Sequence, residues 1–200
     1  MDVDTWDAAE VRERLRALAE ADAGCRRFAA GRHRYRLHPP VADTLVRRFE
    51  QDHGVELPDS YLSFITTVGS GGAGPGFGLL PFGSDEWARQ QADLGDDWAD
   101  LLSTPFPHTG RFQPWPIERA CPRHAPDDEY FDPCWFTGSL VLADIGCGSY
   151  FRLVVTGPAR GQVWSDDLAC DEGLNPGPEF REWYMQWLAK PGATGSGPAA

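Results

Sequence analysis

Hydrophobic positions near the start of the chain recur at helical spacing. Val11, Leu15 and Leu18 are separated by four and three residues, the interval at which side chains share one face of a helix. A cap at residues 4–5, which are Asp and Thr, and a stop at Gly24 would bound this helix. We therefore expect residues 1–24 to form an N-terminal helix that packs on the rest of the domain.

The next stretch changes from a helical to an alternating pattern. In RHRYRLHPP (32–40), Arg32, Arg34 and Arg36 fall on one side of an extended chain and the intervening residues on the other. This alternation predicts a short strand or extended arm that ends at the two prolines. The arginine stripe would be either a solvated strand face or a binding face.

Two further helices and a turn are predicted before residue 84. Apolar residues at helical spacing predict a helix from Val41 to about residue 54, and another that starts at Pro58. The glycine-rich run 69–78 cannot continue a helix, and GLLPFG (78–83) then predicts an apolar strand. The run lacks the Lys-Ser/Thr pair of a phosphate-binding loop, so a structural turn is the favoured interpretation.

The second half of the chain predicts an antiparallel sheet closed by a helix. After a short helix near 84–102 and an irregular stretch to residue 136, apolar runs predict strands at 140–143 and 151–155 and a hairpin into 162–164. An aromatic-rich helix follows at 179–190, and residues 191–200 are expected to form a disordered tail. Helices first and strands later indicate a single α+β domain, with an antiparallel sheet flanked by helices.

The charge of the chain restricts its partners. The net charge is −12, and residues 61–200 hold 8 Lys or Arg against 18 Asp or Glu, whereas residues 1–60 are nearly balanced. Because an acidic surface repels phosphate backbones, nucleic-acid binding is disfavoured. A basic protein partner would complement this surface, although an acidic surface also serves solubility alone.

Cysteine usage and the absence of an apolar leader indicate the cytoplasm. The five cysteines form no tight framework, and the N-terminus is acidic and amphipathic rather than an apolar signal sequence. No run approaches the length of a membrane span. We therefore expect reduced cysteines and a cytoplasmic protein.

Candidate catalytic and metal-binding groups are sparse. Cys121, His124 and Cys134 offer soft ligands, but a structural zinc site needs a fourth, for which His108 or Cys147 would have to serve. Nothing places a nucleophile beside a base and an orienting group. We expect no catalytic centre, no metal and no cofactor, and a metal-dependent hydrolase is the least favoured alternative.

Several motifs, in order, resemble one known family. In FEQDHGVELPDSYLSFITTVGSGGAGPGFGLLPFG (49–83), Leu57-Pro58 precedes Tyr61 and Phe64, and a glycine cluster and a Gly-Leu-Leu-Pro segment follow. The second half of the chain fits the same family pattern, with a Leu-rich strand, Gly-Cys-Gly, Gly-Gln-Val-Trp and the closing aromatic helix. Over residues 33–190 this pattern resembles the SUKH superfamily, also called the SMI1/KNR4 family.

The resemblance implies function by binding. Bacterial members are often immunity proteins that neutralise polymorphic toxins, many of them nucleases, whereas fungal members resemble regulatory interaction modules. Either role is open for this chain, and the family supplies no catalytic residues.

Acidic loops would steer a basic toxin by mimicking nucleic-acid phosphates, and aromatic side chains would anchor the interface. The candidate partner-binding residues are Asp96, Asp97, Trp98, Asp127, Asp128, Glu129 and Tyr130.

Overall fold

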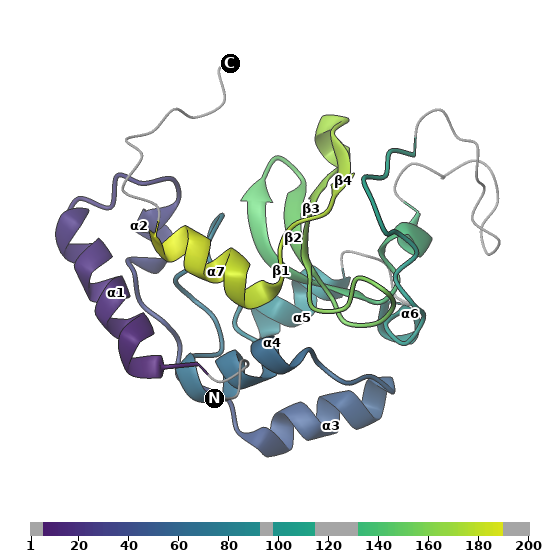
Figure 1. The fold of residues 1–200 in the computed structure, drawn as a ribbon, viewed down its shortest axis with the longest axis horizontal. Coiled ribbons are helices and arrows are strands. Elements are labelled where there is room, and N and C mark those ends of the chain that lie inside the picture. Colours follow the sequence, from purple (N-terminus) through teal and green to yellow (C-terminus); the bar gives the residue numbers. More distant parts are fainter. Residues whose placement is uncertain (1–5, 93–97, 115–131, 190–200) are drawn as a thin grey trace.

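The chain folds as helices followed by an antiparallel sheet that a last helix closes (Figure 1). The computed structural model describes residues 6–92, 98–114 and 132–189. The helical elements are α1 (Ala8–Ala21), α2 (Ala30–His33), α3 (Asp43–His53), α4 (Asp59–Ser63), η1 (Phe64–Val68), α5 (Asp85–Ala92), α6 (Trp98–Leu101), η3 (Pro133–Phe136), η4 (Leu168–Cys170) and α7 (Phe180–Ala189). The strands are β1 (Ser139–Gly146), β2 (Ser149–Val154), β3 (Val163–Asp167) and β4 (Gly173–Asn175). The predicted α+β class is confirmed.

The sheet is an antiparallel meander in the order β1-β2-β3-β4. Leu153 of β2 lies opposite Val163 of β3, and these two side chains enter the core on the helical side. Val154 and Trp164, one position further along each strand, enter a second core on the opposite face. This alternation follows from the two-residue period of a strand, so both faces of the sheet are covered.

Aromatic side chains fill the core between the sheet and the helices. The Trp6 ring lies edge-on to Phe64, Phe180 and Tyr184, with ring centroids 5.1, 6.1 and 5.8 Å away. The indole nitrogen of Trp6 donates to the carbonyl of Ser60 at 2.7 Å. These contacts connect the N-terminal segment to α4, η1 and α7, and α7 lies between α1 and the sheet (Figure 1).

The N-terminal helix is confirmed, but its cap differs from the prediction. Asp7 caps α1, because its side chain accepts the backbone N–H groups of Ala9 and Glu10 at 2.9 and 3.1 Å. The predicted cap positions, residues 4–5, lie outside the described residues. Val11 and Leu15 are buried, as their spacing predicts.

The strand predicted at 32–40 is wrong. Residues 30–33 form one turn of helix, α2, and Arg34 and Tyr35 then adopt left-handed backbone conformations with φ of 47° and 58°. Extended pairing survives only as a single bridge between Leu37 and Gly72. The alternating arginines predicted a strand wrongly because a left-handed residue rotates the side chains that follow it. Alternating positions then do not share a face.

The two helices predicted between residues 41 and 68 are present. Pro58 precedes the first helical residue, Asp59, instead of occupying that position. The strand predicted at 78–83 does not belong to the sheet. Leu79 forms an isolated bridge with Gly72, and Leu80 donates its N–H to the Leu142 carbonyl at 2.8 Å.

The helix expected near 84–102 corresponds to α5 and α6 on either side of residues 93–97, which lie outside the described residues. The three predicted strands and the closing helix are confirmed, while β4 was not predicted. The proposed tail, 191–200, also lies outside the described residues. Among the described helices, none has the length and apolar character needed to cross a bilayer.

Candidate functional site

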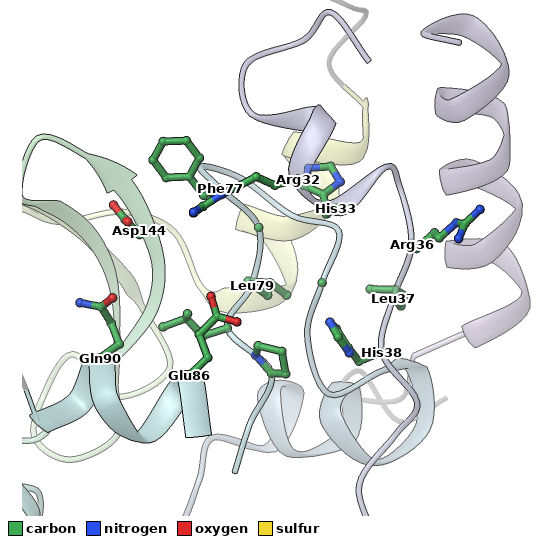
Figure 2. Close-up of a pocket in the computed structure, with 14 residues that line it drawn as sticks. Arg32, His33, Arg36, Leu37, His38, Phe77, Leu79, Glu86, Gln90 and Asp144 are labelled. Atoms are coloured by element: carbon green, nitrogen blue, oxygen red, sulfur yellow. The ribbon is translucent and has the colours of Figure 1, made fainter. Parts of the chain in front are cut away.

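A polar pocket of about 550 Å³ opens between α2 and the glycine-rich loop, residues 69–78 (Figure 2). One wall comes from α2 and the chain after it, through Arg32, His33 and His38. The opposite wall comes from α5 and the end of β1, through Glu86 and Asp144. The pocket thus carries cationic and anionic side chains on facing walls.

A carboxylate holds the α2 wall in place. The Asp22 side chain accepts the hydroxyl of Tyr35 at 2.6 Å and the backbone N–H groups of Arg26 and Arg27 at 2.7 and 3.1 Å. These hydrogen bonds, that of Tyr35 first, lower the pKa of Asp22. Burial and the bond to Asp22 raise the pKa of Tyr35 to about 12. A short polar network therefore fixes the turn that presents α2.

The glycine-rich loop forms the floor of the pocket and binds backbone rather than ligand. Gly72 has φ of 105°, and a Cβ there would collide with the Arg36 carbonyl, so only glycine fits. The N–H groups of Gly72, Ala73 and Phe77 donate to carbonyls of Leu79, Arg36 and Asp144, at 2.8 Å each. These donors are already used, which supports the structural turn expected from the sequence.

A buried tyrosine in the middle of α7 holds this loop in place. The Tyr184 hydroxyl donates to the Ala73 carbonyl at 2.8 Å, and burial raises the pKa of Tyr184. The loop and the segment after it are also bonded to the outer edge of β1, where the N–H of Phe77 donates to the Asp144 carbonyl and that of Leu80 to the Leu142 carbonyl. The floor of the pocket is thereby tied to both the sheet and the core.

Side-chain directions decide which groups face the pocket. Figure 2 shows the Glu86 carboxylate pointing toward the middle of the pocket and the Arg36 guanidinium turned away from it. Arg32 lies over the Phe77 ring, with its guanidinium carbon 4.7 Å from the ring centroid. Burial, and then the nearby Arg27 charge, lower the pKa of His33. Arg32 therefore supplies a permanent positive charge on this wall.

A second pocket, of about 260 Å³, adjoins the first and shares His33 with it. Its walls are mostly apolar and include Phe28, Ile145, Phe151 and Trp187. Together the two pockets offer a charged compartment beside an apolar one. That combination suits a ligand with both a polar and an apolar group.

Of the partner-binding residues predicted from sequence, the structure describes the backbone of one, Trp98. Trp98 is the first residue of α6. The remaining six lie outside the described residues: Asp96, Asp97, Asp127, Asp128, Glu129 and Tyr130. The prediction for these loops stays a prediction, and sequence reasoning did not identify the α2 pockets. The signal available was the run of arginines at 26–36 that no acidic residue interrupts.

The structure describes three of the candidate metal ligands, His108, Cys134 and Cys147. His108 is buried and stacks on Phe112, with ring centroids 4.1 Å apart, and its Nε2 lies 3.0 Å from the Trp135 carbonyl. Cys147 is exposed in the turn between β1 and β2. Cys121 and His124 lie outside the described residues, within which no three His, Cys, Asp or Glu side chains gather to hold an ion.

The expectation that all five cysteines are reduced is wrong for Cys134, which is disulfide-bonded. Cys25, Cys147 and Cys170 carry free thiols. Pairing depends on how closely the fold brings two Cβ atoms together, which the scattered spacing of the cysteines does not show.

Comparison with known families agrees with this architecture. The sequence model of the SMI1/KNR4 family (SUKH-1) matches residues 40–186, which include the glycine-rich loop, the whole sheet and most of α7. Comparisons with curated proteins and with solved structures returned no significant match. Since the family match spans most of the chain, the protein belongs to the SMI1/KNR4 family (SUKH-1).

Proposed function

We propose that this SUKH domain is a non-enzymatic binding protein that neutralises a polymorphic toxin inside the cytoplasm, a nuclease being the favoured class of toxin. The observation that carries the proposal is the family match over residues 40–186. Immunity is the role that the resemblance implies for bacterial members. The domain would act by covering the active site or substrate channel of the toxin.

The charge of the chain supports a basic partner. The net charge is −12, and the excess of Asp and Glu lies after residue 60. A toxin that binds nucleic acid carries a positive surface, and an acidic protein both attracts that surface and competes for it. Long-range attraction of this kind acts mainly on the rate of association.

The buried polar groups of the described residues support a scaffold rather than a reaction centre. Arg152 and Asp166 pair inside the sheet at 2.6 Å, with less than a tenth of either side chain exposed. The Tyr184 hydroxyl is used to hold the glycine-rich loop. These groups stabilise the surfaces on which a partner would dock.

The proposed contact residues are those that the sequence singled out. Asp127, Asp128 and Glu129 would steer the toxin, with Asp96 and Asp97 extending the acidic rim. The aromatic side chains of Trp98 and Tyr130 would anchor the centre of the interface.

The test is the kinetics of association with a toxin domain, sought first among the products of neighbouring genes. We expect the on-rate to fall as salt rises, and a triple variant (Asp127→Asn, Asp128→Asn, Glu129→Gln) to bind about tenfold more slowly at low salt. The control removes three exposed carboxylates elsewhere (Asp43→Asn, Asp52→Asn, Glu56→Gln). The proposed contact residues are wrong if the two variants slow association equally, or if neither responds to salt.

Co-expression distinguishes immunity from a regulatory interaction role. A neighbouring toxin gene that kills the host alone, but not together with this chain, supports immunity. Growth arrest that the chain does not relieve would contradict it and favour a regulatory module of the SMI1/KNR4 type.

A further inference from the structure

A cationic segment lies within this acidic protein. Residues 23–42 contain five Arg, two His and no Asp or Glu. Arg32, Arg34 and Arg36 are exposed. None of them forms a salt bridge with a carboxylate of the described residues, unlike Arg14, whose salt bridge to Glu10 is 2.6 Å long. This segment is therefore an island of positive charge.

One aromatic side chain of the same island is exposed, and it packs against a ring from a neighbouring segment. The Phe28 side chain is 57% exposed and packs on Phe77, with ring centroids 5.5 Å apart. Arg32 covers the other ring, Phe77, and Arg27 lies 5.9 Å from the Trp187 ring. We call Arg27, Phe28, Arg32, Phe77 and Trp187 the α2 surface. Its three N-terminal members, Arg27, Phe28 and Arg32, precede the region matched by the family model.

Backbone strain is concentrated beneath this surface. Cys25, Ala29, Arg34 and Tyr35 have φ between 47° and 58°, and they are four of the six such non-glycine residues in the described chain. In addition, Nη1 of Arg27 is buried without a hydrogen-bond acceptor among the described residues. Each of these features lowers the stability of the fold. Strained backbone and unsatisfied buried polar groups are found mainly at functional sites, including binding surfaces.

We propose that the α2 surface binds an extended acidic segment of a partner protein, with a partner carboxylate on Arg32 and a large apolar side chain against Phe28 and Trp187. The apolar side chain enters the smaller pocket, and the carboxylate sits at the larger one. This surface has the opposite charge to the acidic loops. Binding of an acidic segment here does not require that the partner be a toxin.

The two pockets adjoin, so one extended peptide can reach both. They meet at His33, and side chains two residues apart on an extended chain point the same way, about 6–7 Å apart. The His33 Nδ1 accepts the N–H of Tyr35 at 3.0 Å, so a neutral ring carries its proton on Nε2 and can donate. The simplest peptide that matches the two pockets has an acidic residue, one intervening residue and a large apolar residue, in that order or the reverse.

A peptide fits this surface better than a nucleic acid. Glu86 and Asp144 line the same pocket as Arg32. These carboxylates accept the backbone N–H groups of a peptide but repel a chain of phosphates. The net charge of −12 adds to that repulsion over a longer range.

The experiment titrates the full-length ¹⁵N-labelled protein with the capped peptide Gly-Ser-Glu-Ser-Phe-Ser-Gly. We expect the largest NMR shift changes at the Trp187 indole and the amides of residues 26–36. Replacing Glu by Gln, or Phe by Ser, in the peptide should weaken binding about tenfold, as should Arg32→Gln or Phe28→Ser in the protein. Both protein variants change exposed side chains, and unchanged thermal unfolding checks their folding.

Arg26→Gln is the matched control, because Arg26 belongs to the same segment but lines neither pocket. It should bind the peptide as the parent does. Three results would overturn the proposal. The peptide does not bind, Arg26→Gln loses as much affinity for it as Arg32→Gln does, or the parent protein binds the Gln peptide as tightly as the Glu peptide. Tighter binding of a 15-nucleotide single strand at the same amides would also overturn it and assign the surface to nucleic acid. The Asp127, Asp128, Glu129 triple variant should leave peptide binding unchanged, which separates this test from that of the proposed function.

Discussion

The side chain of Gln91 pairs with the backbone of Val141 as if it were a neighbouring strand. Its amide nitrogen donates to the Val141 carbonyl and its amide oxygen accepts the Val141 N–H, both at 2.9 Å, and Gln91 is completely buried. Strand β1 is an edge of the sheet. An edge strand leaves backbone groups without partners, and at Val141 the amide of Gln91 supplies both partners.

Replacement of Gln91 by Leu should therefore destabilise the domain strongly. The variant would leave two buried backbone groups unpaired, at about 1–3 kcal/mol each, so we expect a loss of about 3 kcal/mol in the free energy of unfolding by urea denaturation. Gln51→Leu makes the same chemical change at an exposed position of α3 and should cost less than about 0.5 kcal/mol. Equal effects of the two substitutions would show that the pairing to Val141 does not stabilise the edge.

The buried pair of Arg152 and Asp166 gives a second test. Burial lowers the pKa of Arg152, against the stabilising charge of Asp166, and its guanidinium lies 3.9 Å from the Phe136 ring centroid. Arg152→Met leaves a buried carboxylate alone and should cost about 3–5 kcal/mol. The double variant Arg152→Met/Asp166→Leu should recover most of that loss in the same denaturation measurement.

The exposed pair of Arg48 and Asp52 is the control for this comparison, because both side chains are mostly in solvent. Arg48→Met should change stability by less than about 1 kcal/mol. If the double variant at 152 and 166 were no more stable than Arg152→Met alone, the cost would come from lost packing and not from the unpaired charge.

The regular parts of the fold could be predicted from the sequence because local periodicity decides them. Val11 and Leu15 mark α1, and Phe180, Trp183 and Tyr184 mark α7, all of them buried as their spacing predicts. In these segments the pattern of burial and the backbone geometry agree. The order of helices and strands then fixed the α+β class.

The chain around the site could not be predicted in the same way, because special backbone geometry shapes it. Arg34 and Tyr35 adopt left-handed conformations. The Tyr35 hydroxyl donates to Asp22, thirteen residues earlier in the sequence, and this bond stabilises the turn. Gln91 pairs with Val141 at the edge of β1 from fifty residues away. Neither relationship leaves a periodic signal. The pattern of residues 32–40 therefore predicts a strand where the chain forms α2 and a left-handed turn. The candidate contacts at Asp127, Asp128 and Glu129 stay a prediction.

Strain at Ala29 predicts a stabilising substitution. Ala29 precedes α2 with φ of 56°, a conformation that costs a side-chain-bearing residue about 1–2 kcal/mol. Ala29→Gly removes this strain but loosens the unfolded chain by about 0.5–1 kcal/mol. We expect a net gain of about 0.5–1 kcal/mol, measured by thermal unfolding.

The control for Ala29→Gly is the same change within a regular helix. Ala88 is exposed in α5, where glycine should cost about 1 kcal/mol. If both glycine variants lose the same stability, the backbone at Ala29 is not strained.

Two buried tyrosines should make the domain unfold steeply in alkali. Burial raises the pKa of Tyr61 and Tyr184 above the ordinary value of 10.0. Above pH 10 the unfolded chain loses both protons while the folded chain keeps them, so the stability that these groups contribute is complete below pH 10 and is lost as pH rises. Two such protons lower the stability by about 2 kcal/mol between pH 10 and 11, and the slope approaches about −3 kcal/mol per pH unit at higher pH, which urea denaturation measures. Tyr61→Phe keeps the ring among Phe82 and Phe180 and should halve the part of the slope due to these two groups, whereas an unchanged slope would mean that Tyr61 ionises freely in the folded protein.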